Sequence, residues 1–243
     1  MYLEKIYKYA DIIEIHKTYS CRYGNHSSRE NRQGTTKKAV AAYNEKLARR
    51  ELARTIKANF EENDIHLTLT YKKHCRPCDI GEAKKLCRKF LDRLKKICGA
   101  GFKYIHSASI GTHGAIHHHL IISYLDPREF RKLWQYGSCY ISYLDGGDYT
   151  ELARYILGQK QKSANPEQMC GRRWSSSRNV KRVKPVVKEI KAKTWIKTPA
   201  PIKGYIVDVD SIESGINPIT GIPYIYYRLR KVPPLSQLRR RCA

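Results

Sequence analysis

Runs of alternating hydrophobic and polar residues predict β-strands, and segments with apolar residues at helical spacing separate these runs. The predicted strands lie within residues 2–20 and at 65–71, 102–110, 116–124, 139–144, 204–211 and 222–231. The predicted helices cover residues 36–63, 80–98, 126–134 and 149–161. Up to residue 162 the order is β, α, β, α, β, β, α, β, α. It favours an α+β fold, with a mainly antiparallel central sheet and helices packed on one face.

Composition divides the chain into three predicted parts. Residues 1–35 hold the first strands and a polar loop, and residues 36–162 form the central domain. Residues 163–243 are a polar, basic C-terminal extension with a predicted β-hairpin around the turn sequence ESGINPITG. A chain of 243 residues is long enough for one large domain with an appendage.

The charge of the chain narrows its partners. Lys and Arg number 47 against 22 Asp and Glu, a formal net charge of +25, and the extension alone carries 17 basic and 5 acidic residues. A field of this strength favours a polyanion, and nucleic acid is the first expectation, ahead of an anionic membrane surface. The N-terminus alternates charged with apolar residues and no apolar run reaches the length of a membrane span. We therefore expect a cytoplasmic protein without a membrane partner.

Eight cysteines in such a protein are expected to be reduced. Cys75 and Cys78 form a C-x-x-C pair, but a structural zinc site needs four ligands and the sequence has no second pair. Either the pair contributes to a zinc site with ligands from elsewhere, or it is a loop that holds two thiols.

Three consecutive histidines lie in the predicted strand at 116–124. Alternation places His117 and His119 on one face of the sheet and His118 on the other. Two imidazoles spaced in this way can hold one divalent cation, Mg²⁺ or Mn²⁺ beside a phosphate, and also Zn²⁺. Without a metal they are ordinary core or surface side chains. Ser109 and His113 are both candidates for a third ligand, whereas His106 has the opposite strand parity to Ser109.

The helix at 149–161 carries a second candidate, Tyr155. Arg154 precedes it, and Glu151, Gln159 and Lys162 share its helical face. Tyr149 is six residues earlier and about 120° away around the helix, so the two tyrosines do not form a pair. Tyr155 is either a nucleophile or an aromatic residue at the edge of the core.

Three motifs occur in an order that resembles the HUH-endonuclease replication initiators of rolling-circle elements, the phage- and plasmid-type Rep proteins. The first is the strand Leu67–Tyr71 with the sequence LTLTY, and the second is the strand IHHHLII at 116–122. The third is LARYI at 152–156, in which a tyrosine follows a small residue and an arginine. The resemblance covers about residues 36–162.

The resemblance implies an HUH endonuclease core that cuts and rejoins single-stranded origin DNA. His117 and His119 would hold Mg²⁺ or Mn²⁺, and Tyr155 would form a 5′-phosphotyrosine bond and free a 3′-OH primer. The family's third ligand, usually Glu, is replaced by Ser109. Glu151 stands where two-tyrosine relatives have their second tyrosine, which implies a single-tyrosine enzyme. The family's lysine after the tyrosine is absent, and Lys162 or Lys160 is its candidate substitute.

Basic and aromatic residues around and after the tyrosine are expected to contact DNA through phosphates and stacked bases. The candidates are Arg154, Lys160, Arg172, Arg173, Trp174, Arg178, Lys181 and Arg182. Trp195 is a further aromatic candidate. The sequence contains no Walker A motif, so a host helicase and polymerase are the expected partners.

Two other interpretations stay open. The chain is a non-catalytic basic DNA- or RNA-binding protein if the histidines and Tyr155 are incidental. It is a transposase or mobilisation nuclease if the same chemistry serves another element, although relaxases place the tyrosine before the histidines.

Overall fold

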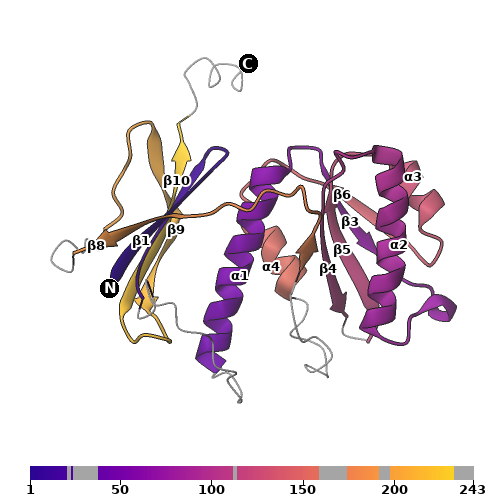
Figure 1. The fold of residues 1–243 in the computed structure, drawn as a ribbon, viewed down its shortest axis with the longest axis horizontal. Coiled ribbons are helices and arrows are strands. Elements are labelled where there is room, and N and C mark those ends of the chain that lie inside the picture. The colour runs from indigo at the N-terminus through magenta and orange to yellow at the C-terminus, as the bar shows by residue number, and fades with distance from the viewer. Residues whose placement is uncertain (21–22, 24–37, 112–113, 159–173, 192–197, 233–243) are drawn as a thin grey trace. The chain divides into compact units, whose positions relative to one another are not determined.

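The computed structural model describes residues 1–20, 23, 38–111, 114–158, 174–191 and 198–232. It divides into two compact units, each with its own sheet. Unit 1 is Met1–Leu47 with Val183–Ala243, and unit 2 is Ala48–Arg182. The two antiparallel sheets and their helices make an α+β structure, as the sequence predicts (Figure 1).

Unit 1 is a five-stranded antiparallel sheet in the order β8-β1-β2-β10-β9. Its strands are β1 (Tyr2–Tyr9), β2 (Ile12–Tyr19), β8 (Val186–Ile190), β9 (Tyr205–Ile216) and β10 (Pro223–Lys231). The hairpin expected in the C-terminal extension is formed by β9 and β10. Strand β10 also pairs with β2, so the first and last described strands of the chain share one sheet. One apolar cluster of this sheet consists of Ile13, Ile15, Ile225, Tyr227 and Leu229.

Unit 2 is built on a second five-stranded antiparallel sheet in the order β6-β3-β5-β4-β7. Its strands are β3 (Ile65–Leu69), β4 (Tyr104–Ile110), β5 (Ile116–Ile122), β6 (Cys139–Tyr143) and β7 (Ser175–Ser176). Four α-helices are described: α1 (Lys38–Asn59), α2 (Ile80–Cys98), α3 (Pro127–Leu133) and α4 (Thr150–Gly158). Among the described residues a single 3-10 turn, η1 (Lys73–Cys75), precedes α2.

Helices cover both faces of the unit 2 sheet, so the expectation of helices on one face is wrong (Figure 1). The apolar end of β5 explains the second layer. Leu120 and Ile122 pack with α2 and α3, whereas Ile121 between them packs with α4 and the part of α1 after Ala48. A strand that is apolar on both sides needs cover on both sides.

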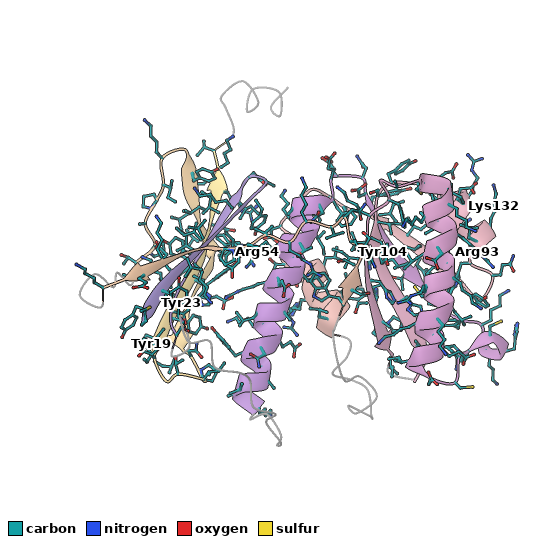
Figure 2. The ribbon with its side chains drawn as sticks, in the orientation of Figure 1. Tyr19, Tyr23, Arg54, Arg93, Tyr104 and Lys132 are labelled. Carbon is teal, nitrogen blue, oxygen red and sulfur yellow. The ribbon has the colours of Figure 1, made fainter. Side chains whose placement is uncertain are left out.

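Helix α2 forms the outer layer on its face of unit 2. It begins as the sequence predicts, because the Asp79 carboxylate accepts a hydrogen bond from the Glu82 N–H at 2.8 Å and the Glu82 carboxylate accepts one from the Cys78 N–H at 2.7 Å. Its other side is polar: Figure 2 shows Arg93 of α2 and Lys132 of α3 projecting away from the sheet. Within the part of the chain that the structure describes, no helix combines the length and apolar character needed to cross a membrane.

Candidate active site

Strand β5 places the three histidines, because it lies between β3 and β4 with polar residues opposite it. His119 pairs with Thr68 of β3 and with Ser107 of β4. His117 pairs with Ser109 of β4. Directly opposed residues in an antiparallel pair point to the same face. One face of the sheet is therefore polar at the end of β5 that carries the histidines.

The alternation expected for these histidines is present in the structure. The rings of His117 and His119 are neighbours, with centroids 5.1 Å apart. His118 points to the opposite face, where it contacts Tyr71 and Trp134. The two outer imidazoles thus share the face covered by α4, and His118 lies in the core under α2 and α3.

Tyr155 lies beside His119 on that face. The two ring centroids are 5.2 Å apart, and the rings meet at 75°. Helix α4 is anchored by Ala153, Ile156 and Leu157, which are all buried, while Tyr155 remains 50% exposed. The helix start is held by the Asp148 carboxylate, which accepts a hydrogen bond from the Thr150 N–H at 2.8 Å. The fold therefore presents the Tyr155 hydroxyl group at the surface while fixing the helix that carries it.

His66 is a residue of this site that the sequence analysis missed. It lies on β3, is 8% exposed and stacks on His119 with ring centroids 5.4 Å apart at 20°. Its Nε2 lies 3.2 Å from Nδ1 of His119, and its Nδ1 lies 3.1 Å from Oγ of Ser142. The Tyr155 ring is also close to it, with centroids 6.1 Å apart. The available signal was parity, since His66 and Thr68 alternate onto one face of the predicted strand.

Burial controls the charge of the inner histidines. It lowers the pKa of His66 to about 4 and is the largest cause that lowers the pKa of His119 to about 3, with His66 the next contributor. Both imidazoles are therefore neutral at pH 7, which is the form that binds metals.

Two unsatisfied polar atoms mark the place where a cation fits. Nε2 of His119 and Oγ of Ser109 are buried, and neither has a hydrogen-bond partner among the described residues. Buried polar atoms are rarely left unpaired, and an unrecorded ion is one of the ordinary explanations. The expected donor set of His117, His119 and an oxygen from Ser109 is consistent with this observation. His113, the other candidate third ligand, lies outside the described residues.

The opposite face holds a second group of donor atoms. Cys87, His106 and His118 are all buried, and their ligand atoms lie within 4.8 Å of one another, a spacing that could hold a metal. Both nitrogens of His118 already have partners. Its Nδ1 is 2.9 Å from Nε2 of His106, and its Nε2 is 2.8 Å from Oη of Tyr71. Burial raises the pKa of the Cys87 thiol to about 12, so that side chain stays protonated. These contacts favour a buried hydrogen-bond chain.

The C-x-x-C pair lies outside both groups. Cys78 is exposed and Cys75 is half-buried next to η1. Among the described residues, no two further His, Cys, Asp or Glu side chains gather around this pair as metal ligands. Of the two interpretations, the described part of the chain favours a loop that holds two thiols.

The expected DNA contacts have mixed positions. Arg178 and Lys181 are exposed, and Arg154 is exposed and paired with Glu151 at 2.8 Å. Trp174 was expected to be exposed for base stacking, and this is wrong: it is 8% exposed and belongs to the core under α4. The guanidinium of Arg182 covers its ring at 3.9 Å. The predictions for Lys160, Lys162, Arg172, Arg173 and Trp195 lie outside the described residues.

The sequence profile of a family of replication-associated proteins, the ORF2 type, matches residues 64–164. This segment runs from β3 through α4 and includes His66, His117, His119 and Tyr155. No curated protein and no solved structure matches the chain. The similarity supports a role in DNA replication, and with it an interaction with DNA.

Proposed function

We propose that this protein is a replication initiator that nicks and religates single-stranded origin DNA through a covalent bond to Tyr155. The observation that carries the proposal is the contact between Tyr155 and His119, which joins two separate sequence motifs at one surface. Both residues lie within the segment that is similar to replication-associated proteins.

The nucleophile in this reaction is Oη of Tyr155. It attacks the scissile phosphorus, the Oη–P bond forms, and the bond from phosphorus to the 3′ oxygen breaks. The phenolic proton passes to water, to which the half-exposed side chain is open, and the departing 3′ oxygen takes a proton from water. The products are a 5′-phosphotyrosine and a free 3′-OH. Attack by a 3′-OH on the phosphotyrosine reverses each step and religates the strand.

The ordinary pKa of tyrosine is near 10, so the reaction needs a positive charge near the phosphate. A divalent cation, Mg²⁺ or Mn²⁺ bound by His117 and His119, would supply it by polarising a phosphate oxygen. The neutral imidazoles and the two unpaired atoms on His119 and Ser109 support this assignment. The contribution of Lys162 or Lys160 stays a prediction, because both lie outside the described residues.

Two further features support DNA as the substrate. The formal net charge of +25 favours a polyanion at any surface position. A cavity of about 360 Å³ opens beside His66, between β6 and the start of α4, and Ser142, Tyr149 and Glu151 are among its lining residues. A nucleotide next to the scissile phosphate would find space there. A host helicase and polymerase stay the predicted partners for extending the freed 3′ end.

The test is a search for the covalent adduct. The full chain is incubated with Mn²⁺ and a labelled pool of random single-stranded oligonucleotides, and the mixture is resolved on a denaturing gel. We expect a labelled band at the mass of protein plus DNA, with the modified peptide mapped by mass spectrometry to Tyr155. Binding without any adduct would support the non-catalytic nucleic-acid-binding interpretation. An adduct on another residue would overturn the assignment of Tyr155.

A further inference from the structure

We infer that His66 is a positioning residue that fixes the tautomer of His119, with Ser142 as its support. In this tautomer His119 carries its proton on Nδ1 and leaves Nε2 bare for a cation. The inference rests on the proposed function, because it assigns a ligand role to His119. It adds two residues, from β3 and β6, to a site so far defined by β5 and α4.

A continuous chain of hydrogen bonds carries this inference. Nδ1 of His119 lies 3.2 Å from Nε2 of His66, and Nδ1 of His66 lies 3.1 Å from Oγ of Ser142. The Ser142 hydroxyl in turn donates to the backbone carbonyl of His66 at 3.4 Å. Each link accepts one proton and donates the next, so the chain ends on an acceptor that cannot change.

The direction of the chain follows from the buried end of His119. If the protons ran the other way, His66 would donate to Nδ1 of His119 and the proton of His119 would sit on Nε2. That N–H would be buried without an acceptor among the described residues, at a cost of about 1–3 kcal/mol. In the direction we infer, Nε2 carries only a lone pair, which a cation satisfies. A metal-binding histidine generally donates its other N–H to such a partner.

Ring packing restricts His119 as well. The His66 ring is stacked on it at 20°, and the Thr68 hydroxyl lies 3.3 Å from the same Nδ1. Tyr155 meets the edges of both rings. His66 therefore controls the rotation of the His119 ring as well as its proton, and it does so next to the proposed nucleophile.

The direct test is NMR of the imidazole nitrogens in the metal-free protein. Long-range proton–nitrogen spectra of ¹⁵N-histidine-labelled full-length chain distinguish a protonated Nδ1 from a protonated Nε2. We expect His119 as the Nδ1–H tautomer in the wild type and a shift toward Nε2–H in His66→Phe. A wild-type His119 with its proton on Nε2 would overturn the inference, whether or not the protein cuts DNA.

The second test measures Mn²⁺ binding by calorimetry on folded protein. His66→Phe keeps the stacked ring but loses the acceptor, so we expect affinity to fall by about 10–100-fold. His66→Gln keeps an acceptor and should recover most of this loss, which a merely space-filling role would not produce. The matched control is His74→Phe at the exposed histidine of η1, which should bind Mn²⁺ as the wild type does.

The outcomes separate the inference from the proposed function. Equal Mn²⁺ affinity for His66→Phe and the wild type overturns the positioning role while leaving the nuclease assignment intact. No Mn²⁺ binding by any form, together with no adduct, overturns the proposed function. The tautomer of His119 in the NMR spectra then still decides the direction of the hydrogen-bond chain.

Discussion

The ring of Tyr155 stands edge-on to the ring of His119, with centroids 5.2 Å apart and an angle of 75° between the planes. One residue belongs to a helix and the other to the central strand of a five-stranded sheet. The contact depends on α4 packing over the face that carries Ile121 and Ile105. The apolar core of that face therefore sets the distance between the proposed nucleophile and the proposed cation site.

Replacement of Tyr155 by Phe should abolish covalent adduct formation and strand nicking while leaving DNA binding intact. The side chain is 50% exposed, so losing its hydroxyl should change the free energy of unfolding by less than about 0.5 kcal/mol. Nicking assays, filter binding and thermal denaturation measure the three quantities. An unchanged nicking rate would contradict the proposed role.

The matched control for that experiment is Tyr124→Phe. Tyr124 is 61% exposed and should nick at the wild-type rate. Tyr149 is a poorer control than its place near α4 suggests. It is 6% exposed, and its Oη accepts a hydrogen bond from the Gly146 N–H at 3.0 Å. Tyr149→Phe should still nick, but with a free energy of unfolding lower by about 1–3 kcal/mol.

The three consecutive histidines should separate into two classes on substitution. His117→Ala and His119→Ala should each abolish nicking and Mn²⁺ binding. His118→Ala should instead destabilise the fold by about 2–5 kcal/mol, because it leaves Tyr71 and His106 without their buried partner and opens a cavity. Urea denaturation and nicking below the unfolding transition measure the two effects. Equal loss of nicking in all three variants with equal stability would show that strand alternation does not govern their roles.

Local patterns predicted much of the site. The alternation of His117, His118 and His119 depends only on strand geometry, and the Asp79 cap depends only on neighbouring residues. His66 was missed because its role depends on which strands pair. Only the register that sets His66 opposite Ile121 and Thr68 opposite His119 brings it to the site. No local pattern contains that register.

Other features required tertiary information as well. Trp174 follows a basic segment and was interpreted as an exposed stacking residue, yet it fills the core beside Ile105 and Ile156. Aromatic residues supply large apolar areas, and burial of the ring outweighs the polarity of its neighbours in sequence. In the same way, nothing in the first twenty residues indicates that β2 pairs with β10 from the other end of the chain.

Thiol labelling should divide the cysteines by burial. Cys78 is exposed and should react with iodoacetamide within minutes at pH 8, whereas Cys87 is fully buried and its pKa is raised to about 12. The thiolate is the reactive form, so Cys87 should be labelled only after unfolding. Mass spectrometry of peptides from native and urea-treated protein measures both. Protection of Cys87 lost on adding a chelator, with the fold unchanged, would instead indicate a metal at Cys87, His106 and His118.

Single-stranded DNA binding should weaken steeply with salt, and exposed cations near β7 should account for part of the slope. Arg178→Gln and Lys181→Gln each remove an exposed positive charge. Each should reduce the slope of log K against log salt by about 0.7 if its side chain contacts a phosphate. Deleting residues 163–243 is a poor substitute for these variants, because it removes β8, β9 and β10 from the sheet of unit 1.

The matched control for these charge variants is Lys89→Gln, since Lys89 is exposed on α2, on the face of the sheet opposite Tyr155. It removes the same charge from a surface that the proposed DNA path does not cross, so its slope should equal that of the wild type. Fluorescence anisotropy with a labelled oligonucleotide between 50 and 200 mM salt gives the slopes. Equal slopes for all three variants and the wild type would place the DNA elsewhere on the protein.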